Sequence, residues 1–300
     1  MKQHWKNWCW ICSLWKNKTR DAVCGFLPQT ASVCIRVMSM MNKKKSNWIV
    51  GVLLCLAIVV FVVSMWQLLC IGQQYRLGSC GYEELAQTVV TQTPPEQPAL
   101  QAAETTQPSK PQPLLQVDFQ SLTQINPDTI AWLRGCDGEI DHPIVQGKNN
   151  KYYLRHLFDG TANENGTVFA DSRNNADLQD ENTFIYGHNM NNGAMFAALL
   201  HYRTQGYYDE HRELILVTPR QSFYLWPFSG YVTAADSDAY TISFEEEDSF
   251  GDYLEKICAR SEFVSSVTVT PQDRIVTLST CAYDFDEARY VLHCKLVLAQ

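Results

Sequence analysis

The feature that most constrains this 300-residue chain is an uncharged, apolar run over residues 48–71. Its 24 residues are rich in Val, Leu and Ile, and a helix needs about 20 such residues to cross a bilayer. A cleaved signal peptide is the alternative, but the run is longer than a typical signal core and no small-x-small cleavage site follows it. Lys43, Lys44 and Lys45 precede the run. The positive-inside rule then predicts a single-pass membrane protein with a cytoplasmic N-terminus and residues 72–300 outside the cell.

The charge distribution supports two compartments. Residues 1–47 carry nine Lys and Arg against one acid, Asp21. Residues 117–300 carry 13 Lys and Arg against 27 Asp and Glu, a net charge of −14. An acidic body lacks the basic surface that phosphate binding requires, which excludes nucleic acid as a partner. We expect residues 1–47 to be a basic cytoplasmic tail, unless residues 1–40 are a mis-assigned start and the protein begins at Met41.

The segment after the apolar run has a different composition. We expect residues 72–116 to be a juxtamembrane segment followed by a linker, because 18 of the 30 residues from 87 to 116 are Gln, Pro or Thr. Such a composition buries too little apolar surface to fold and predicts an extended tether. Residues 117–300 are then the globular domain.

The cysteines do not form a disulfide framework. The chain has eleven, scattered over the tail, the apolar run and the body, whereas disulfide-stabilised domains are small and dense in cysteine. Cys9 and Cys12, followed by Cys24 and Cys34, could hold zinc, but their spacing is loose and no histidine completes a known pattern there. We therefore expect no metal.

The body is predicted to be mainly β. Residues 118–125 and 127–133 are expected to form two short helices, the second with Pro127 in its first turn. A helical insertion is expected around residues 250–258, where apolar residues recur with helical spacing. Short strands separated by turn residues predict a barrel or a sandwich. The expected strands are 143–146, 167–170, 183–186, 214–218, 222–233, 274–280 and 289–298.

The last two strands are joined by a short segment, which predicts a hairpin. Side chains alternate between the faces of a strand, so the apolar even-numbered residues of both strands face a core. The odd-numbered residues, including Cys281 and Arg289, share the other face. A slip of one residue would bury the polar set, and the register that pairs Cys281 with Arg289 is therefore favoured.

This pairing has chemical consequences. A positive charge favours the thiolate, which is the reactive form of cysteine, and an arginine also stabilises an oxyanion. A cysteine nucleophile further needs a proton shuttle. His188 directly follows a short apolar strand and is the best-placed histidine. His293 lies on the polar face and is the alternative, although we expect it to be a partly exposed strand histidine without a catalytic role. We predict a Cys281, His188 and Arg289 site, against the simpler interpretation that Cys281 is a small buried residue. Cys258 and Cys294, on apolar faces, are predicted to be structural.

These residues resemble motifs of the sortase family, and of class B sortases in particular. TLSTC over residues 277–281 is similar to the family's T-L-x-T-C motif, and Arg289 opens the next strand as the family's arginine does. YGHNM over residues 186–190 is similar to its histidine motif. Residues 117–147 resemble the class B N-terminal helices and first strands, and residues 249–260 resemble the class B helix before the cysteine strand. The likeness covers about residues 117–300.

The resemblance implies a fold and a reaction. It implies an eight-stranded β-barrel with N-terminal helices and a helical insertion, here preceded by a transmembrane helix. It implies a cysteine transpeptidase in which Cys281 attacks a threonyl bond of a C-terminal sorting signal. His188 is then the acid and base, Arg289 holds the oxyanion and the substrate, and Ser279 lines the groove. Class B enzymes imply no metal and no organic cofactor.

The implied partners are surface proteins with a sorting signal and an amine of peptidoglycan, which would anchor those proteins to the cell wall. Three alternatives stay open. A pilus-building sortase would use a pilin lysine as the acceptor. A cysteine peptidase would use water. An anchored binding module would perform no chemistry.

Overall fold

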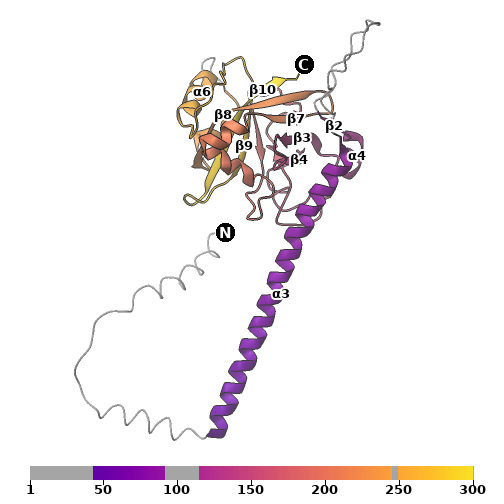
Figure 1. Ribbon diagram of the computed structural model, residues 1–300, viewed down its shortest axis with the longest axis vertical. Coiled ribbons are helices and arrows are strands. Elements are labelled where there is room, and N and C mark those ends of the chain that lie inside the picture. The colour runs from indigo at the N-terminus through magenta and orange to yellow at the C-terminus, as the bar shows by residue number, and fades with distance from the viewer. Residues whose placement is uncertain (1–42, 92–114, 245–248, 300) are drawn as a thin grey trace, which may run out of the picture. The chain divides into compact units, whose positions relative to one another are not determined.

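The computed structural model of the protein describes residues 43–91, 115–244 and 249–299 (Figure 1). The chain divides into two units, Met1–Gln67 and Leu68–Gln300. The predicted cytoplasmic tail up to residue 42, with its alternative start at Met41 and its Cys9 and Cys12 pair, lies outside the described residues.

The first described element is helix α3 (Lys43–Val89), 47 residues long. Its segment Val50–Gln73 has a mean hydropathy of 2.7 and is the one helix in the described ranges that is long and apolar enough to cross a membrane. The large apolar side chains of this segment are exposed. The predicted run of residues 48–71 is thus helical, and the helix continues well beyond it.

The last turns of α3 pack on the body rather than leading directly into a linker. Tyr82 and Val89 are buried, and the Tyr82 hydroxyl donates to the Gly166 carbonyl at 2.8 Å. Strand β1 (Val90–Thr91) then pairs antiparallel with β2 (Gln116–Val117).

Residues 87–91 are therefore helix and strand, and the prediction of an extended linker is wrong for them. The rest of that segment, up to residue 114, lies outside the described residues. The boundaries of the four regions stay a prediction.

Eight strands close into a barrel in the order β10-β8-β7-β3-β4-β5-β6-β9, which confirms the predicted fold (Figure 1). Most neighbours are antiparallel, but β4 with β5 and β6 with β9 are parallel. The strands are β3 (Thr129–Gly135), β4 (Asp141–Val145), β5 (Phe169–Ala170), β6 (Asn182–Tyr186), β7 (Leu214–Val217), β8 (Ser222–Ala234), β9 (Ile275–Cys281) and β10 (Ala288–Leu298).

Strand β3 corrects one prediction, because residues 127–133 were expected to be helical. The Asn126 side chain accepts a hydrogen bond from the Asp128 backbone at 2.9 Å, which makes a turn at Pro127 instead of a helix start. Trp132 and Leu133 are then fully buried between β4 and β7. Proline fits the turn as well as a first helical turn, so the local signal was ambiguous.

The helices lie outside the barrel wall. Helix α4 (Phe119–Ile125) is the first predicted helix and is capped by Asp118, and α6 (Ser249–Ala259) is the predicted insertion. The 3₁₀ helix η1 (Ala197–Arg203), helix α5 (Gln205–Glu210) and the 3₁₀ turn η2 (Asp238–Tyr240) were not anticipated.

Helix α6 covers the face of the β9–β10 hairpin that was expected to be polar. Its buried residues Phe250 and Ile257 belong to an apolar cluster with Val291 and Ile275 of the hairpin. His293, expected to be partly exposed on that face, is fully buried. The odd-numbered face is therefore covered along most of its length and opens only at its end.

Candidate active site

The hairpin of β9 and β10 places Cys281 opposite Arg289. The two residues are directly paired across the antiparallel strands, as the alternation of side chains predicted. The turn between them is closed by the Ala282 backbone amide donating to the Ala288 carbonyl at 3.0 Å. The thiol and the guanidinium therefore lie at the same open end of the barrel.

His188 reaches this end through a different strand. Strands β6 and β9 are parallel neighbours, and Tyr186 pairs with Ser279. Both strands run in the same direction, and His188 and Cys281 each lie two residues beyond this pair. The two side chains are therefore neighbours. The Thr280 hydroxyl donates to the Gly187 carbonyl at 2.8 Å and holds the two strand ends together.

One pocket contains all four predicted site residues. A cavity of about 200 Å³ is lined by His188, Ser279, Cys281 and Arg289. Cys281 is half-buried, so its sulfur is shielded from bulk water yet reachable by a substrate.

The histidine has a defined tautomer. His188 Nε2 lies 2.8 Å from the Leu154 carbonyl. A carbonyl only accepts hydrogen bonds, so Nε2 carries the proton in this contact. Nδ1 is then the nitrogen left to exchange a proton with a reacting group.

The loop after His188 is fixed to the cysteine strand. The Asn189 side-chain amide donates to the Cys281 carbonyl at 2.9 Å, and the Phe196 amide donates to the His188 carbonyl at 2.9 Å. Gly187 permits this packing, because an added Cβ would lie only 2.6 Å from the Phe196 ring.

The arginine is held by the turn. Arg289 Nη1 donates to the Ala288 carbonyl at 2.9 Å, and Nη2 donates to the Glu287 carboxylate at 3.0 Å. The Glu287 side chain is 78% exposed, so this ion pair is solvent-screened and weak. Arg289 can leave it for a stronger anion.

A second cavity of about 360 Å³ extends the first. It shares Tyr186, Ser279 and Arg289 with the first cavity, so the two form one groove. Buried Ser279 exchanges a hydrogen bond with the Tyr240 hydroxyl at 2.8 Å. Ser279 thus lies in the groove wall, as the resemblance implied.

The groove is backed by a charged network. The Tyr186 hydroxyl donates to the fully buried carboxylate of Asp171 at 2.9 Å. Burial alone would raise the pKa of Asp171, but hydrogen bonds from Arg173, Asn150 and Tyr186 lower it to about 2. The ionised carboxylate orients Tyr186 at physiological pH.

Sequence reasoning missed several residues of this groove. Its lining also includes Tyr186, Tyr240, Asn150 and Leu154. Tyr186 stands beside His188 in the motif and could have been found. Asn150 and Leu154 lie in an irregular segment without periodicity, where the sequence carries no such signal.

The alternative residues are placed elsewhere. His293 is buried, hydrogen-bonded to Thr277 at 2.8 Å, and burial lowers its pKa to about 3. Cys294 is also buried, as predicted, and burial raises the pKa of its thiol. Cys258 was predicted to lie on an apolar face and to be structural, but it is exposed.

Comparisons with known proteins agree with this geometry. A family model described as a sortase domain matches residues 137–297. The curated Sortase B of Listeria monocytogenes is 37% identical over 182 residues, which cover 60% of this chain and 74% of that protein.

Solved structures give the same result. The Staphylococcus aureus sortase B–substrate complex has a TM-score of 0.58 and 32% identity, over 61% of this chain and 85% of that one. Clostridium perfringens sortase B has a TM-score of 0.58 and 33% identity, over 60% of this chain and 100% of that one.

The fold and these matches define a class, the cysteine transpeptidases, and the chain belongs to the sortase family. Within that family it is a class B sortase, because its curated relatives are Sortase B enzymes at 37% and 32% identity.

Proposed function

We propose that Cys281 is the nucleophile that forms a thioacyl intermediate with a protein substrate. The observation that carries this proposal is the single cavity lined by Cys281, His188 and Arg289. The half-buried sulfur attacks the carbonyl carbon of a threonyl peptide bond in a C-terminal sorting signal. A carbon–sulfur bond forms and the carbon–nitrogen bond breaks.

His188 moves the proton in both half-reactions. In the first, Nδ1 gives a proton to the departing amine, which leaves the thioester and a neutral imidazole. In the second, an acceptor amine attacks the thioester and Nδ1 takes its proton, restoring the thiolate and the imidazolium. The Leu154 carbonyl keeps the ring oriented throughout, because it holds the proton on Nε2.

Arg289 stabilises the negative charge that develops on the substrate oxygen. Its guanidinium stays ionised and lies directly across the strand pair from Cys281. Arg289 gives up its weak, exposed ion pair with Glu287 and binds the oxyanion instead, whose charge appears only during the reaction. Ser279 and Tyr186 supply polar groups to the wall where the sorting signal lies.

The acceptor is an amine of peptidoglycan, so that the reaction anchors surface proteins to the cell wall. The support is the class B relationship and the apolar segment Val50–Gln73, which is suited to hold the enzyme at the membrane. The lysines before this segment favour a cytoplasmic N-terminus and an extracellular catalytic domain.

The test is intact-mass analysis of the full chain in detergent, incubated with a panel of threonyl sorting peptides. A thioacyl adduct is expected in the native protein and absent in Cys281→Ala. Cys258→Ala is the matched control, since it removes an exposed thiol outside the groove and should keep the adduct.

The second half of the assay adds acceptors. A peptidoglycan-type amine should resolve the adduct faster than a pilin lysine peptide or water alone. Preference for the pilin lysine would assign pilus assembly, and indifference to amines would assign a peptidase. If no peptide forms an adduct, the protein is a binding module and the proposal is wrong.

A further inference from the structure

The last turns of α3 are seated on the barrel through one face of the helix. Tyr82 and Val89 are buried, and Leu85 and Ala86 pack against the same core cluster. Their spacing of three, four and seven residues places all four side chains on one helical face. The Val89 carbonyl accepts from the Asp118 backbone amide at 2.9 Å, which fixes the end of the helix. The side chain of Tyr82 therefore enters the body in a defined position.

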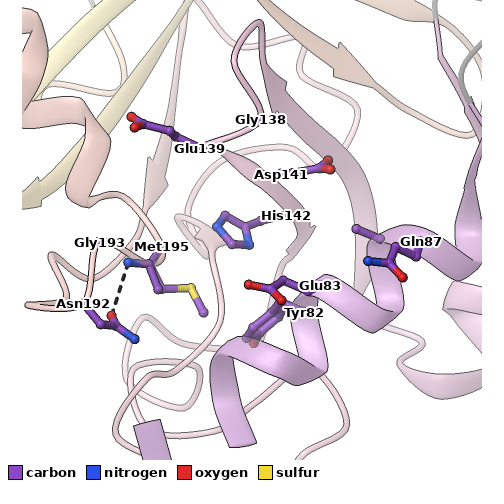
Figure 2. A pocket seen from close by; sticks show the side chains of 12 residues that line it. Tyr82, Glu83, Gln87, Gly138, Glu139, Asp141, His142, Asn192, Gly193 and Met195 are labelled. Atoms are coloured by element: carbon purple, nitrogen blue, oxygen red, sulfur yellow. Dashed lines mark hydrogen bonds between the residues drawn. The ribbon is translucent and has the colours of Figure 1, made fainter. Parts of the chain in front are cut away.

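Two contacts hold Tyr82 there. Its ring packs edge-on against the His142 ring, with centroids 5.5 Å apart. Figure 2 shows both side chains beside a cavity of about 430 Å³ that α3 and the barrel enclose. Its hydroxyl donates to the Gly166 carbonyl at 2.8 Å, and the same oxygen lies 2.9 Å from Thr167 Oγ1. The first contact belongs to the ring and the second to one polar atom, so a mutation can separate them.

Gly166 lies directly against the peptide that orients the active-site histidine. A Cβ atom added at Gly166 would lie 2.9 Å from the Leu154 carbonyl oxygen and 3.1 Å from His188 Cδ2. It would lie only 2.5 Å from the Tyr153 carbonyl oxygen. The backbone φ of Gly166 is 61°, so glycine suits both this conformation and the close approach. The hydrogen bond from Tyr82 thus ends on a residue that touches both Leu154 and His188.

Thr167 fixes the same segment at two further points. Its backbone amide donates to the Tyr153 carbonyl at 2.9 Å, and its hydroxyl donates to the His156 carbonyl at 2.8 Å. Leu154 lies between these two anchored residues and belongs to neither a helix nor a strand. The position of its carbonyl therefore depends on how its neighbours are held, because no regular ladder of hydrogen bonds fixes it.

We propose that Tyr82 is a positioning residue for the transpeptidation reaction. Its hydroxyl holds Gly166 and Thr167, which fix the segment that carries the Leu154 carbonyl. That carbonyl in turn holds His188 through Nε2 at 2.8 Å. Tyr82 lines neither cavity of the groove and touches no reacting group. This role rests on the proposed function, because it affects the rate only if His188 moves the proton.

The expected effect is on the rate of proton transfer rather than on substrate binding. An imidazole that is free to turn presents Nδ1 to the reacting amine in only a fraction of the molecules, and a small misplacement of a reacting group lowers the rate strongly. Tyr82→Phe keeps the ring beside His142 and removes only the hydroxyl. With a threonyl sorting peptide and a peptidoglycan-type amine, kcat should fall about tenfold while KM stays within about twofold.

Tyr202→Phe is the matched control. Tyr202 is also buried, and its hydroxyl also donates to a backbone carbonyl, that of His211, at 2.8 Å. It lines neither cavity of the groove. Both variants should lower the unfolding temperature, because each leaves a carbonyl without its partner, but only Tyr82→Phe should lower kcat. Thr167→Val removes the hydroxyl beside Tyr82, should lower kcat in the same way, and replaces Tyr82→Phe if that variant does not fold.

A second measurement observes the histidine without relying on activity. In the full chain in detergent, labelled with ¹⁵N-histidine, the proton on His188 Nε2 should exchange slowly with water because it is bonded to the Leu154 carbonyl. Its NMR signal is assigned by its absence in His188→Gln. The exchange should be at least about fivefold faster in Tyr82→Phe and unchanged in Tyr202→Phe.

The outcomes distinguish the role of Tyr82 from the proposed function. Native kcat in Tyr82→Phe, an equal loss of kcat in both tyrosine variants, or a loss of kcat without faster exchange would overturn the role of Tyr82 and leave the thioacyl chemistry intact. If the native chain forms no thioacyl adduct, the proposed function fails. The exchange of the His188 proton then still decides whether Tyr82 positions the ring.

Discussion

The two ends of the β9–β10 hairpin carry similar residues in opposite environments. At the open end, Cys281 is half-buried and faces Arg289, with His188 beside it. Further along β10, His293 and Cys294 are fully buried. Burial lowers the pKa of His293 to about 3 and raises that of the Cys294 thiol, so neither ionises near neutral pH. A cysteine and a histidine become a reactive site only where solvent access and a cationic partner coincide.

The strongest test of this contrast replaces each of the two cysteines by alanine in a separate variant. Cys281→Ala should lower the transpeptidation rate at least about 10³-fold with little change in unfolding temperature, because it removes the nucleophile alone. Cys294→Ala should keep the rate within about threefold but lower stability by about 1 kcal/mol, because it leaves a small cavity. Rates with a sorting peptide and thermal unfolding of both variants provide the comparison. A Cys294→Ala enzyme as inactive as Cys281→Ala would remove the distinction between the two ends.

The next test concerns the cationic partner. Arg289→Lys should reduce kcat about 10²-fold, because a point charge does not reproduce the planar guanidinium at the oxyanion. Arg203→Lys is the matched control, since Arg203 also pairs with the turn, through Asp284 at 3.0 Å, but lines neither cavity of the groove. It should stay within about threefold of native. A near-native rate in Arg289→Lys would contradict the oxyanion role.

The buried end should be sensitive to acid. An unfolded histidine titrates at a pKa of about 6.5, whereas folded His293 titrates at about 3. Below pH 6.5 the unfolded state therefore takes up a proton that the folded state does not, and stability falls as pH falls toward 3. At pH 5 this amounts to at most about 2 kcal/mol.

Thermal unfolding at pH 7 and pH 5 measures this effect. His293→Gln should show a smaller loss between the two pH values than the native chain, although His142 keeps a similar contribution. His201→Gln changes an exposed histidine and should leave the difference unaltered. Equal pH dependence of all three proteins would show that His293 does not titrate as its burial implies.

The same contrast shows how much the sequence could predict. The register of Cys281 with Arg289 followed from alternation along two adjacent strands, and it is confirmed. The exposure of His293 was mispredicted, because alternation shows which residues share a face but not that α6 covers that face. Local patterns determine pairing, while burial depends on elements distant in the chain.

Long-range placements were the least predictable. The parallel pairing of β6 with β9 brings His188 to Cys281 across more than 90 residues. This pairing was not predicted, because the sequence indicated only that a loop after a short strand could present His188. Leu154, which orients His188, comes from a stretch without regular structure. The hydrogen bond of Tyr82 to Gly166 was also not predicted. The polar linker that follows α3 gives no sign that the last turns of this helix are buried.

The smallest expected effect concerns the ion pair that holds Arg289 at rest. Glu287→Gln removes an exposed partner worth about 0.2–1 kcal/mol. If Arg289 must leave Glu287 to meet the oxyanion, its loss should raise kcat by up to about threefold and leave stability almost unchanged. Asp286→Asn, on the same exposed turn but without a pair to Arg289, is the control. A fall in kcat on Glu287→Gln would instead mean that Glu287 positions the guanidinium for the reaction.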